Sequence, residues 1–521
     1  MSQRFPGRRL SIVRLVALGA TVALVVTGAV LGWNRFSDVR AASTAASFFA
    51  GYVDVTATPS YPFEAGAAPG GRSVVLSFIV ADPKSACKPS WGAAYGLGDA
   101  GTSMDLDRRI ARFTRNGGEV SVSFGGAANS ELATVCTDAQ QLKNAYEQVI
   151  GRYDLTTIDL DIEGDNLSDP QAGQRRAEAI AAVQKDRRAA GRALNVWLTL
   201  PVATTGLTES GTTAVRQMLA ADVNLAGVNV MTMDFNTGLG TSRSMLDASI
   251  SAADATHAQL AALYTGAGVD LGADTLWRKI GLTPMIGQND VPGEVFGLDA
   301  AAGLNAYARK KGIGRVSLWS LNRDATCGTN YPDVTRVSDG CSGVNQGSTR
   351  FAQVLGQGIT GPEDAAIATP KSVSTTAPII DNPTTSPYPI WSPEASYVAD
   401  DRVVWHGNVY SAKWWTLDDL PDNPAVQAAD TPWSLIGPVL PGDRPAPVIA
   451  VPAGTYPAWS AAPVYEKGNR VLFEGRILES KWWNQGESPR AALEGSSSSP
   501  WIKLKDDEVR KILSARQTTA P

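Results

Sequence analysis

Three carboxylates recur at every second position of the segment 157–164, which reads TIDLDIEG. Side chains alternate between the two faces of a strand, so Asp159, Asp161 and Glu163 share one face and aliphatic residues share the other. Both faces of a parallel barrel strand are buried, and three crowded acids there oppose one another's ionisation. At least one carboxyl is therefore expected to stay protonated near neutral pH, as a general acid requires. These three residues are the candidate catalytic residues.

Further candidate residues lie where other apolar, β-branched segments end. In a closed barrel of parallel strands, active sites lie at the C-terminal ends of the strands. We therefore expect the residues at these ends to contact the substrate of the same site. Gln288 and Trp319 lie at the ends of the seventh and eighth of these segments.

Eight short segments rich in β-branched residues alternate with alanine-rich stretches long enough to form helices. The segments span residues 52–56, 74–80, 120–124, 157–163, 196–202, 228–234, 280–286 and 316–320. Eight such units between residues 48 and 358 predict an α/β fold, a (β/α)8 TIM barrel, which typically needs about 250 residues plus insertions. A doubly wound open sheet is the alternative, although no glycine-rich dinucleotide-binding loop supports it.

The acidic segment resembles the fourth-strand motif of the family 18 glycoside hydrolases, DxxDxDxE, in which the final Glu is the acid. Asp159, Asp161 and Glu163 match in register, whereas Thr156 stands at the first Asp position. The segment SFGG at 123–126 matches the family's SxGG, and MTMD at 231–234 matches MxYD except that Met233 replaces Tyr. The resemblance covers residues 48–358 and implies a chitinase barrel with Trp319 under the reacting sugar. It also implies that the two matched motifs contact the substrate through Ser123, Gly125, Gly126, Met231, Met233 and Asp234.

The resemblance also implies the mechanism. Asp161 and Glu163 are neighbours on one strand and cannot lie on opposite sides of a sugar, as a retaining enzyme with its own nucleophile requires. The family instead uses the substrate's N-acetyl oxygen as nucleophile, with Asp161 accepting the acetamido N–H and Asp159 balancing charge behind it. A thioether cannot donate the hydrogen bond that the family Tyr gives to this acetamido group, so Gln288 is a candidate donor in place of Met233.

After the predicted barrel, the segment 359–388 is rich in proline, threonine and serine and is expected to be an extended linker. Beyond it, two segments repeat at an offset of 68 residues, so that a Trp-Trp pair at 414–415 corresponds to the pair at 482–483. We predict two small all-β modules at 389–438 and 456–505, a linker at 439–455 and a tail at 506–521.

The repeats resemble the family 5/12 carbohydrate-binding modules, with AKWW at 412–415 and SKWW at 480–483. Strand alternation would place Trp415 and Trp483 in solvent, where they could stack on chitin, and Trp414 and Trp482 in the core. Tyr397 and Tyr465 are further candidate chitin-binding residues. The alternative is that the aromatic residues mainly build the core of a very small domain.

The N-terminus carries a stretch of 19 uncharged residues at 15–33, which is about the length of a membrane-spanning helix. Four arginines precede it and two follow it closely, so residues 1–14 are expected in the cytoplasm and the chain after residue 33 outside. We predict a membrane anchor at 15–33 and a stalk at 34–47. A cleaved signal peptide, which would release the protein, is the alternative.

Four cysteines permit three pairings. Cys87 follows the second predicted strand and Cys136 follows the third, while Cys327 and Cys341 share the loop after the eighth. We predict the disulfides Cys87–Cys136 and Cys327–Cys341, which suit a compartment outside the cytoplasm.

Composition narrows the function further. The net charge of −5 provides no basic field for nucleic acid, and two histidines make histidine-based zinc sites and Ser–His–Asp triads poor candidates. We expect a monomeric chitinase without metal or organic cofactor, acting on polymers of β-1,4-linked N-acetylglucosamine. The alternatives are an endo-N-acetylglucosaminidase acting on glycans or peptidoglycan and a catalytically silent chitin-binding lectin.

Overall fold

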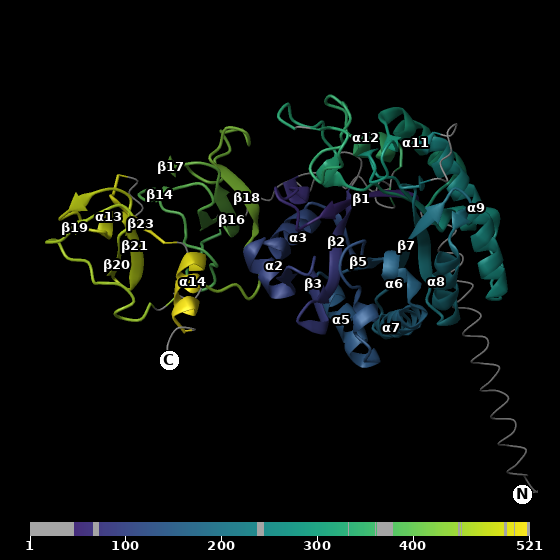
Figure 1. The fold of residues 1–521 in the computed structure, drawn as a ribbon, viewed down its shortest axis with the longest axis horizontal. Helices are drawn as coiled ribbons and strands as arrows, with labels where there is room; N and C mark the ends of the chain where they lie inside the picture. Colours follow the sequence, from purple (N-terminus) through teal and green to yellow (C-terminus); the bar gives the residue numbers. More distant parts are fainter. Residues whose placement is uncertain are drawn as a thin grey trace, which may run out of the picture. The chain divides into compact units, whose positions relative to one another are not determined.

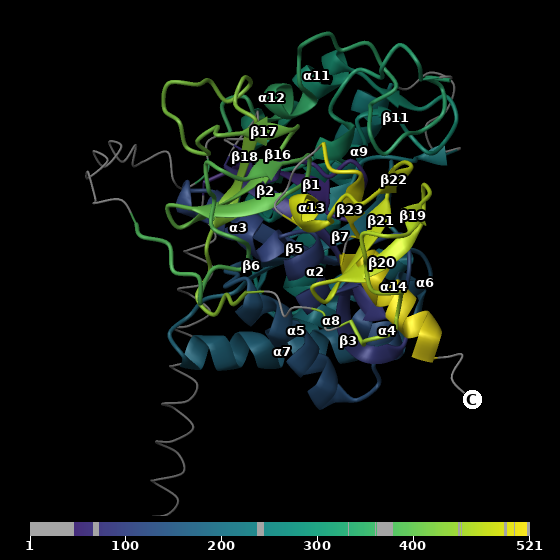
Figure 2. The same cartoon turned by 90° about the vertical axis from the view of Figure 1, so that its left-hand side faces the viewer.

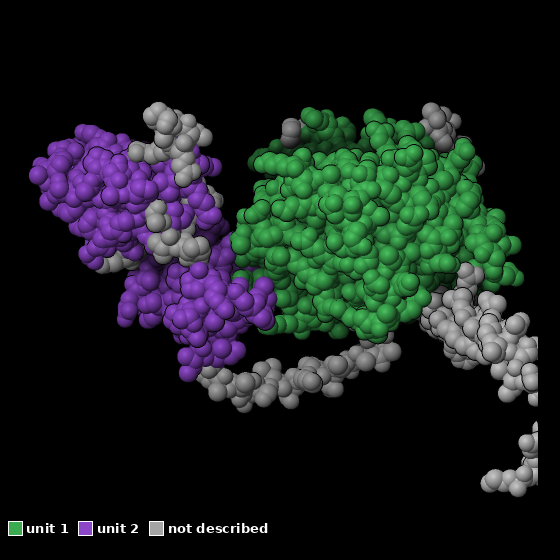
Figure 3. Space-filling model, turned by 90° about the horizontal axis from the view of Figure 1, so that it is seen from below, with its two compact units in different colours: residues 1–368 green, residues 369–521 purple. Residues whose placement is uncertain are grey.

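The computed structural model describes residues 46–65, 72–236, 244–331, 333–359, 361, 379–445, 449, 451–493, 498–504 and 506–517. The chain divides into two compact units, residues 1–368 and 369–521, which Figure 3 colours separately. The predicted membrane segment 15–33 lies outside the described residues. Within the described ranges, no helix combines the length and the apolar character needed to cross a bilayer.

The first unit contains a closed barrel of eight parallel strands. Each strand pairs with the next around the ring, and the last pairs with the first. This closure confirms the predicted barrel and excludes an open doubly wound sheet. In order around the ring, the strands are β1 (Phe48–Asp54), β2 (Ser73–Asp82), β5 (Glu119–Gly125), β6 (Thr157–Asp161), β7 (Asn195–Ala203), β9 (Leu225–Met231), β10 (Ile280–Thr283) and β13 (Arg315–Val316).

Helices surround the strands (Figures 1 and 2). Aliphatic side chains of the strands, such as Ile158, Leu160 and Ile162 around β6, are fully buried within the same core as the inner faces of these helices. The longer helices are α3 (Leu106–Arg115), α5 (Ala139–Arg152), α7 (Pro170–Ala189), α8 (Glu209–Ala220), α9 (Met245–Gly266) and α11 (Leu298–Lys311). Shorter ones are α2 (Leu97–Ser103), α4 (Leu132–Val135), α6 (Gly164–Ser168), α10 (Ala273–Arg278), α12 (Phe351–Gly356), η1 (Phe63–Ala65) and η3 (Leu321–Arg323).

Short strands extend the barrel at its loops. The strand β3 (Ser85–Trp91) adds antiparallel to β2, and β4 (Tyr95–Gly96) adds to β3; β8 (Gly206–Leu207) pairs with β7, and β11 (Gly287–Gln288) pairs with β12 (Val295–Phe296). Both predicted disulfides are confirmed, Cys87–Cys136 linking β3 to the end of α4 and Cys327–Cys341 closing the loop after the eighth barrel strand.

The second unit contains the two repeats as small all-β modules. Each has one three-stranded antiparallel sheet and one two-stranded sheet. Module 1 comprises β14 (Ser396–Tyr397), β15 (Arg402–Trp405), β16 (Asn408–Ala412), β17 (Thr416–Leu417) and β18 (Trp433–Pro438). Module 2 comprises β19 (Val464–Tyr465), β20 (Arg470–Phe473), β21 (Arg476–Ser480), β22 (Asn484–Gln485), α13 (Arg490–Leu493), β23 (Trp501–Lys503) and α14 (Asp506–Gln517).

The module cores correct one prediction. Tyr397 and Tyr465, expected to contact chitin, are each only 8% exposed. Their rings pack edge-on against Trp433 and Trp501 at centroid distances of 5.2 and 4.8 Å. They are buried because sheets this small need large aromatic residues to form any core.

The packed modules also extend beyond their predicted boundaries. Asp381, assigned to the linker, accepts backbone hydrogen bonds from His406 and Gly407 of module 1 at 2.7 Å each. The predicted tail forms α14, whose Val509 is buried against Ile477 and other apolar residues of module 2. The composition of the predicted linker is typical of an extended segment, although Asp381 near its end is held to module 1 by hydrogen bonds.

One pair of equivalent positions joins a basic side chain to a carboxylate in both modules, with the two residue types in reversed order. In module 1, His406 Nδ1 lies 2.5 Å from Asp422 Oδ2. In module 2, where every number is larger by 68, Glu474 pairs with Arg490. Each pair connects the turn between the first two strands of the three-stranded sheet to the loop before its last strand.

Candidate active site

The acidic face of β6 points into the barrel, as predicted. Asp159 is fully buried, Asp161 is 4% exposed, and Asp161 and Glu163 line a cavity of about 250 Å³. The strand itself ends at Asp161, but Glu163 keeps an extended backbone (φ −146°, ψ 172°) directly before α6. The alternation of side chains therefore continues to Glu163, and the aliphatic residues between the acids point to the surrounding helices.

The cavity lies at the C-terminal ends of the barrel strands, where the site was expected. Of the predicted residues, Asp161, Glu163, Met231, Met233, Asp234 and Trp319 line it. The remaining lining residues, which the sequence analysis did not select, are Tyr52, Phe78, Ala127, Thr199, Thr283, Met285, Asp290 and Asp339. One wall of the cavity is aromatic, because Phe78 stacks on Trp319 at 5.4 Å and Tyr52 packs edge-on against the same indole.

The electrostatics of the cavity favour protonated carboxyls. Burial raises the pKa of Glu163 to about 7, and the negative charges of Asp234 and Asp290 contribute to the shift. Burial also raises the pKa of Asp161 well above its ordinary value; Glu163 and Asp159 add to this shift, and Arg315 opposes it. Glu163 therefore combines access to the cavity with a pKa suited to donating a proton near neutral pH.

Asp159 lies beneath the cavity and does not line it. Its carboxylate accepts hydrogen bonds from Tyr52 Oη (2.9 Å), Ser123 Oγ (2.8 Å), Thr199 Oγ1 (2.7 Å) and Arg315 Nη1 (2.7 Å). Ser123, predicted to bind substrate, instead supports this carboxylate.

Two glycines allow β5 to approach the acidic strand. Gly125 has φ +107°, and a Cβ atom there would lie 2.0 Å from the carbonyl oxygen of Asp161. The backbone N–H of Gly126 donates to the same oxygen at 2.9 Å. Gly125 and Gly126, predicted as substrate-binding, thus hold the main chain of Asp161 in place and do not line the cavity.

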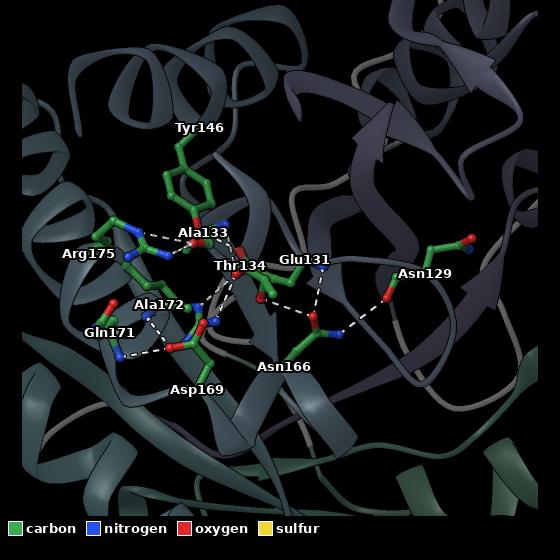
Figure 4. A network of polar contacts seen from close by, with 11 residues as sticks. Asn129, Glu131, Ala133, Thr134, Tyr146, Asn166, Asp169, Gln171, Ala172 and Arg175 are labelled. Atoms are coloured by element: carbon green, nitrogen blue, oxygen red, sulfur yellow. Dashed lines mark hydrogen bonds and ion pairs between the residues drawn. The ribbon is translucent and has the colours of Figure 1, made fainter. Parts of the chain in front are cut away.

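A polar network fixes the helix that follows Glu163 (Figure 4). Asn166 of α6 accepts hydrogen bonds from the backbone N–H of Glu131 (3.1 Å) and from Thr134 Oγ1 (3.0 Å). The Glu131 carboxylate in turn accepts from Tyr146 Oη at 2.6 Å and pairs with the buried Arg176 at 2.8 Å. The loop after β5 therefore anchors α6 and restricts where Glu163 can move.

Gln288 is not placed where the sequence analysis expected it. The seventh barrel strand ends at Thr283, and Gln288 lies on the separate strand β11, outside the residues that line the cavity. Its backbone carbonyl accepts a hydrogen bond from Arg323, and its side chain lies against Gly343. A role as donor to the substrate in place of the missing tyrosine is therefore not supported by this position.

The tryptophan pairs of the modules are exposed, and they correct a second prediction. Trp414 and Trp482, expected in the cores, are 46% and 48% exposed, as their neighbours Trp415 and Trp483 are at 50% and 58%. The strands β16 and β21 end at Ala412 and Ser480, so both pairs lie in turns where strand alternation does not apply. Each module thus presents two adjacent indoles to solvent.

The chain is similar in sequence to proteins named as chitinases. It is 36% identical over 261 residues to a probable bifunctional chitinase/lysozyme of Escherichia coli (strain K12), covering 49% of this chain and 28% of that protein. It is 34% identical over 256 residues to endochitinase 11 of Metarhizium anisopliae, covering 48% of this chain and 47% of that protein. The chain thus spans less than half the length of either relative. No family model matches the chain.

Comparison with solved structures also finds proteins named as chitinases. The catalytic domain of a hyperthermophilic chitinase from Pyrococcus furiosus matches 60% of this chain and 96% of that domain, with a TM-score of 0.52 and 28% sequence identity. The comparisons of sequence and of structure thus both match this chain to proteins named as chitinases.

Proposed function

We propose that the barrel hydrolyses polymers of β-1,4-linked N-acetylglucosamine by substrate-assisted, retaining catalysis, with Glu163 as the general acid. The observation that carries the proposal is a carboxyl of raised pKa that lines the cavity, two residues along the chain from a second buried acid. The similarity to proteins named as chitinases also supports the proposal.

In this mechanism Glu163 transfers its proton to the glycosidic oxygen as the bond from that oxygen to the anomeric carbon breaks. The carbonyl oxygen of the substrate's own acetamido group forms a new bond to the anomeric carbon, and Asp161 accepts the acetamido N–H to hold the group in place. Glu163, now a carboxylate, removes a proton from the water that opens this intermediate. Water attacks from the side of the departed sugar, so the original anomeric configuration is restored.

Product analysis on soluble chitin oligosaccharides tests the mechanism. The β-anomer should appear first in NMR spectra of the products, and fully deacetylated chitosan and cellulose should resist cleavage. Rapid hydrolysis of either polymer, or an initial α-product, would contradict substrate assistance and would point to a nucleophile from the protein.

Peptidoglycan is a second candidate substrate, because one relative is named a chitinase/lysozyme. Turbidity loss of a cell-wall suspension, measured beside chitin hydrolysis at matched enzyme concentration, separates the two. A catalytically silent lectin would show neither activity while still binding chitin.

The modules and the N-terminus complete the proposal. The exposed indole pairs of both modules would stack on the flat faces of chitin sugars, which would hold the enzyme on insoluble polymer. The apolar segment 15–33 would anchor the protein outside the cell membrane as a monomer. Membrane fractionation followed by protease treatment of intact cells would test the anchor, since a secreted protein would appear in the medium.

A further inference from the structure

Arg315 places a positive charge in the centre of the barrel. It begins on β13, which lies four strands from β6 in either direction around the ring, and its side chain crosses the interior to Asp159 at 2.7 Å. The guanidinium also donates to Ser317 Oγ at 2.8 Å and lies over the rings of Tyr52 and Trp197. Arg315 is 2% exposed and does not line the cavity, so any effect on catalysis acts through another residue.

The Asp159 side chain is the acceptor in every hydrogen bond found at it. The amide of Asn229 donates to the hydroxyl oxygens of Tyr52 (3.3 Å) and Thr199 (3.0 Å). The two hydroxyl oxygens lie 3.1 Å apart, but each lies closer to Asp159, at 2.9 and 2.7 Å. An ionised carboxylate only accepts, whereas a protonated one needs an acceptor for its own proton. The surroundings of Asp159 therefore fit the ionised form.

Asp161 lies in the opposite situation. Its Oδ1 atom is buried and has no hydrogen-bond partner among the described residues. The titratable groups that face it are Asp159 and Glu163 on its own segment, and Tyr52 and Arg315 from other strands. Arg315 directs its Nη1 atom to Asp159. A second negative charge at Asp161 would be buried, unpaired and adjacent to two acids, which is costly.

We propose that Arg315 is a positioning residue that fixes the negative charge of the Asp159–Asp161 pair on Asp159 and leaves the proton on Asp161. The inference rests on the function proposed above. A neutral Asp161 keeps its carbonyl oxygen for the acetamido N–H. It also places no second negative charge beside Glu163 when Glu163 gives up its proton, so Arg315 assists the chemical step and not substrate binding.

Kinetics over a range of pH test the proposal, with Arg315→Met removing the charge and Arg315→Lys keeping it. Arg315→Met should lower kcat on soluble chitin oligosaccharides about tenfold or more, with KM within about twofold, because the residue does not contact substrate. Its acidic limb should move to higher pH, since loss of a buried cation favours protonation of the remaining acids. Arg315→Lys should keep the limb near its original position.

Thermal unfolding gives a test that does not depend on activity. Breaking a buried ion pair leaves an uncompensated charge, so Arg315→Met should lower the melting temperature by about 5 °C or more near pH 7. The loss should shrink at acidic pH, where the carboxylate is neutralised. Combining Arg315→Met with Asp159→Asn should restore most of the melting temperature, whereas combining it with Asp161→Asn should restore much less.

Each outcome decides between a charge effect and simple packing. Equal losses in kcat for Arg315→Lys and Arg315→Met without a shift of the acidic limb, or equal rescue by Asp159→Asn and Asp161→Asn, would overturn the proposal. If Arg315→Met does not fold, recovery of folding by Asp159→Asn but not Asp161→Asn supports it, and the reverse refutes it. Should the wild type cleave no chitin oligosaccharide while the rescue pattern holds, the proposed function fails and the charge placement stands.

Discussion

The barrel and the two modules depart from the usual distribution of side chains in opposite ways. The barrel buries charged residues at its centre, where Asp159 and Arg315 are both almost fully inaccessible. Each module instead exposes two large indoles at nearly half of their surface or more. Buried charge and exposed aromatic surface are both unfavourable for folding alone, and both lie at the places where function is proposed.

The two regions also tolerate these features by different means. In the barrel, four donors surround Asp159, so most of the desolvation cost is offset by charge-assisted hydrogen bonds. In the modules, the exposed pairs lie in turns, and separate aromatic residues such as Trp433 and Trp501 form the cores. A substitution in the barrel site should therefore change chemistry, and one at the exposed indoles should change attachment.

The largest expected effect is on the rate. Glu163→Gln removes the general acid and should lower hydrolysis of soluble chitin oligosaccharides by about 10²–10⁴-fold. Retention of the same variant on chitin beads should match the wild type, because the modules are untouched. A variant that kept more than a tenth of the wild-type rate would show that Glu163 is not the acid.

The next effect concerns attachment alone. Trp414→Ala and Trp415→Ala should each weaken binding to insoluble chitin by roughly tenfold, if stacking on sugar falls at the low end of the about 1–3 kcal/mol known for bases on aromatic rings. Melting temperature and turnover of soluble oligosaccharides should not change.

Trp433→Ala is the matched control for these two variants, because it removes an indole that is 2% exposed. It should destabilise module 1 by about 3–5 kcal/mol. Loss of stability in Trp414→Ala of similar size would mean that this ring belongs to the core after all.

A smaller effect is expected in the pH dependence. With the pKa of Glu163 near 7, kcat/KM should fall as pH rises through about 7, because the acid loses its proton. Asp290→Asn removes a negative charge that raises this pKa, so the falling limb should move to lower pH. Asp339→Asn, at another carboxylate lining the cavity, is the control and should shift it less. A limb that stays in place in Asp290→Asn would contradict the assigned cause.

The smallest expected effect concerns the reversed residue pairs of the two modules and their contribution to stability. Replacing the His406–Asp422 contact of module 1 by the ion pair of module 2, with His406→Glu and Asp422→Arg together, should leave the melting temperature of the chain nearly unchanged. His406→Glu alone places a second carboxylate beside Asp422 and should cost up to about 1 kcal/mol, the usual scale for surface pairs. A larger loss in the double variant than in the single one would show that the polarity is not exchangeable.

Much of the barrel could be predicted from the sequence, because its strands are short β-branched runs separated by helix-forming stretches. The shared face of Asp159, Asp161 and Glu163 follows from local alternation, which needs no knowledge of the rest of the chain. Arg315 and Tyr52 could not be found this way, since their partner lies across the barrel and 156 and 107 residues away in sequence. Asp290 lies in a loop, where no periodicity places a side chain.

In the modules, local alternation leads to a wrong prediction because it does not hold past the ends of the strands. Strand alternation predicts opposite environments for the two rings of each Trp-Trp pair. This prediction is wrong for Trp414 and Trp482 because β16 and β21 end before them. Tyr397 and Tyr465 are buried because each module has few residues from which to build a core. Composition indicates that some aromatic rings must form that core, but it does not indicate which ones.

The reversed order of basic and acidic residues in the two modules bears on how a chain with two similar repeats assembles correctly. Repeat proteins misassemble when a segment of one repeat packs into its neighbour. If the loop carrying Arg490 packed onto module 1 it would meet His406, and if the loop carrying Asp422 packed onto module 2 it would meet Glu474. Neither exchange forms an ion pair, and the second brings two carboxylates together. The turn at His406 therefore favours the segment with Asp422, and the turn at Glu474 favours the segment with Arg490. This preference holds even though the two repeats share their fold and most of their aromatic residues.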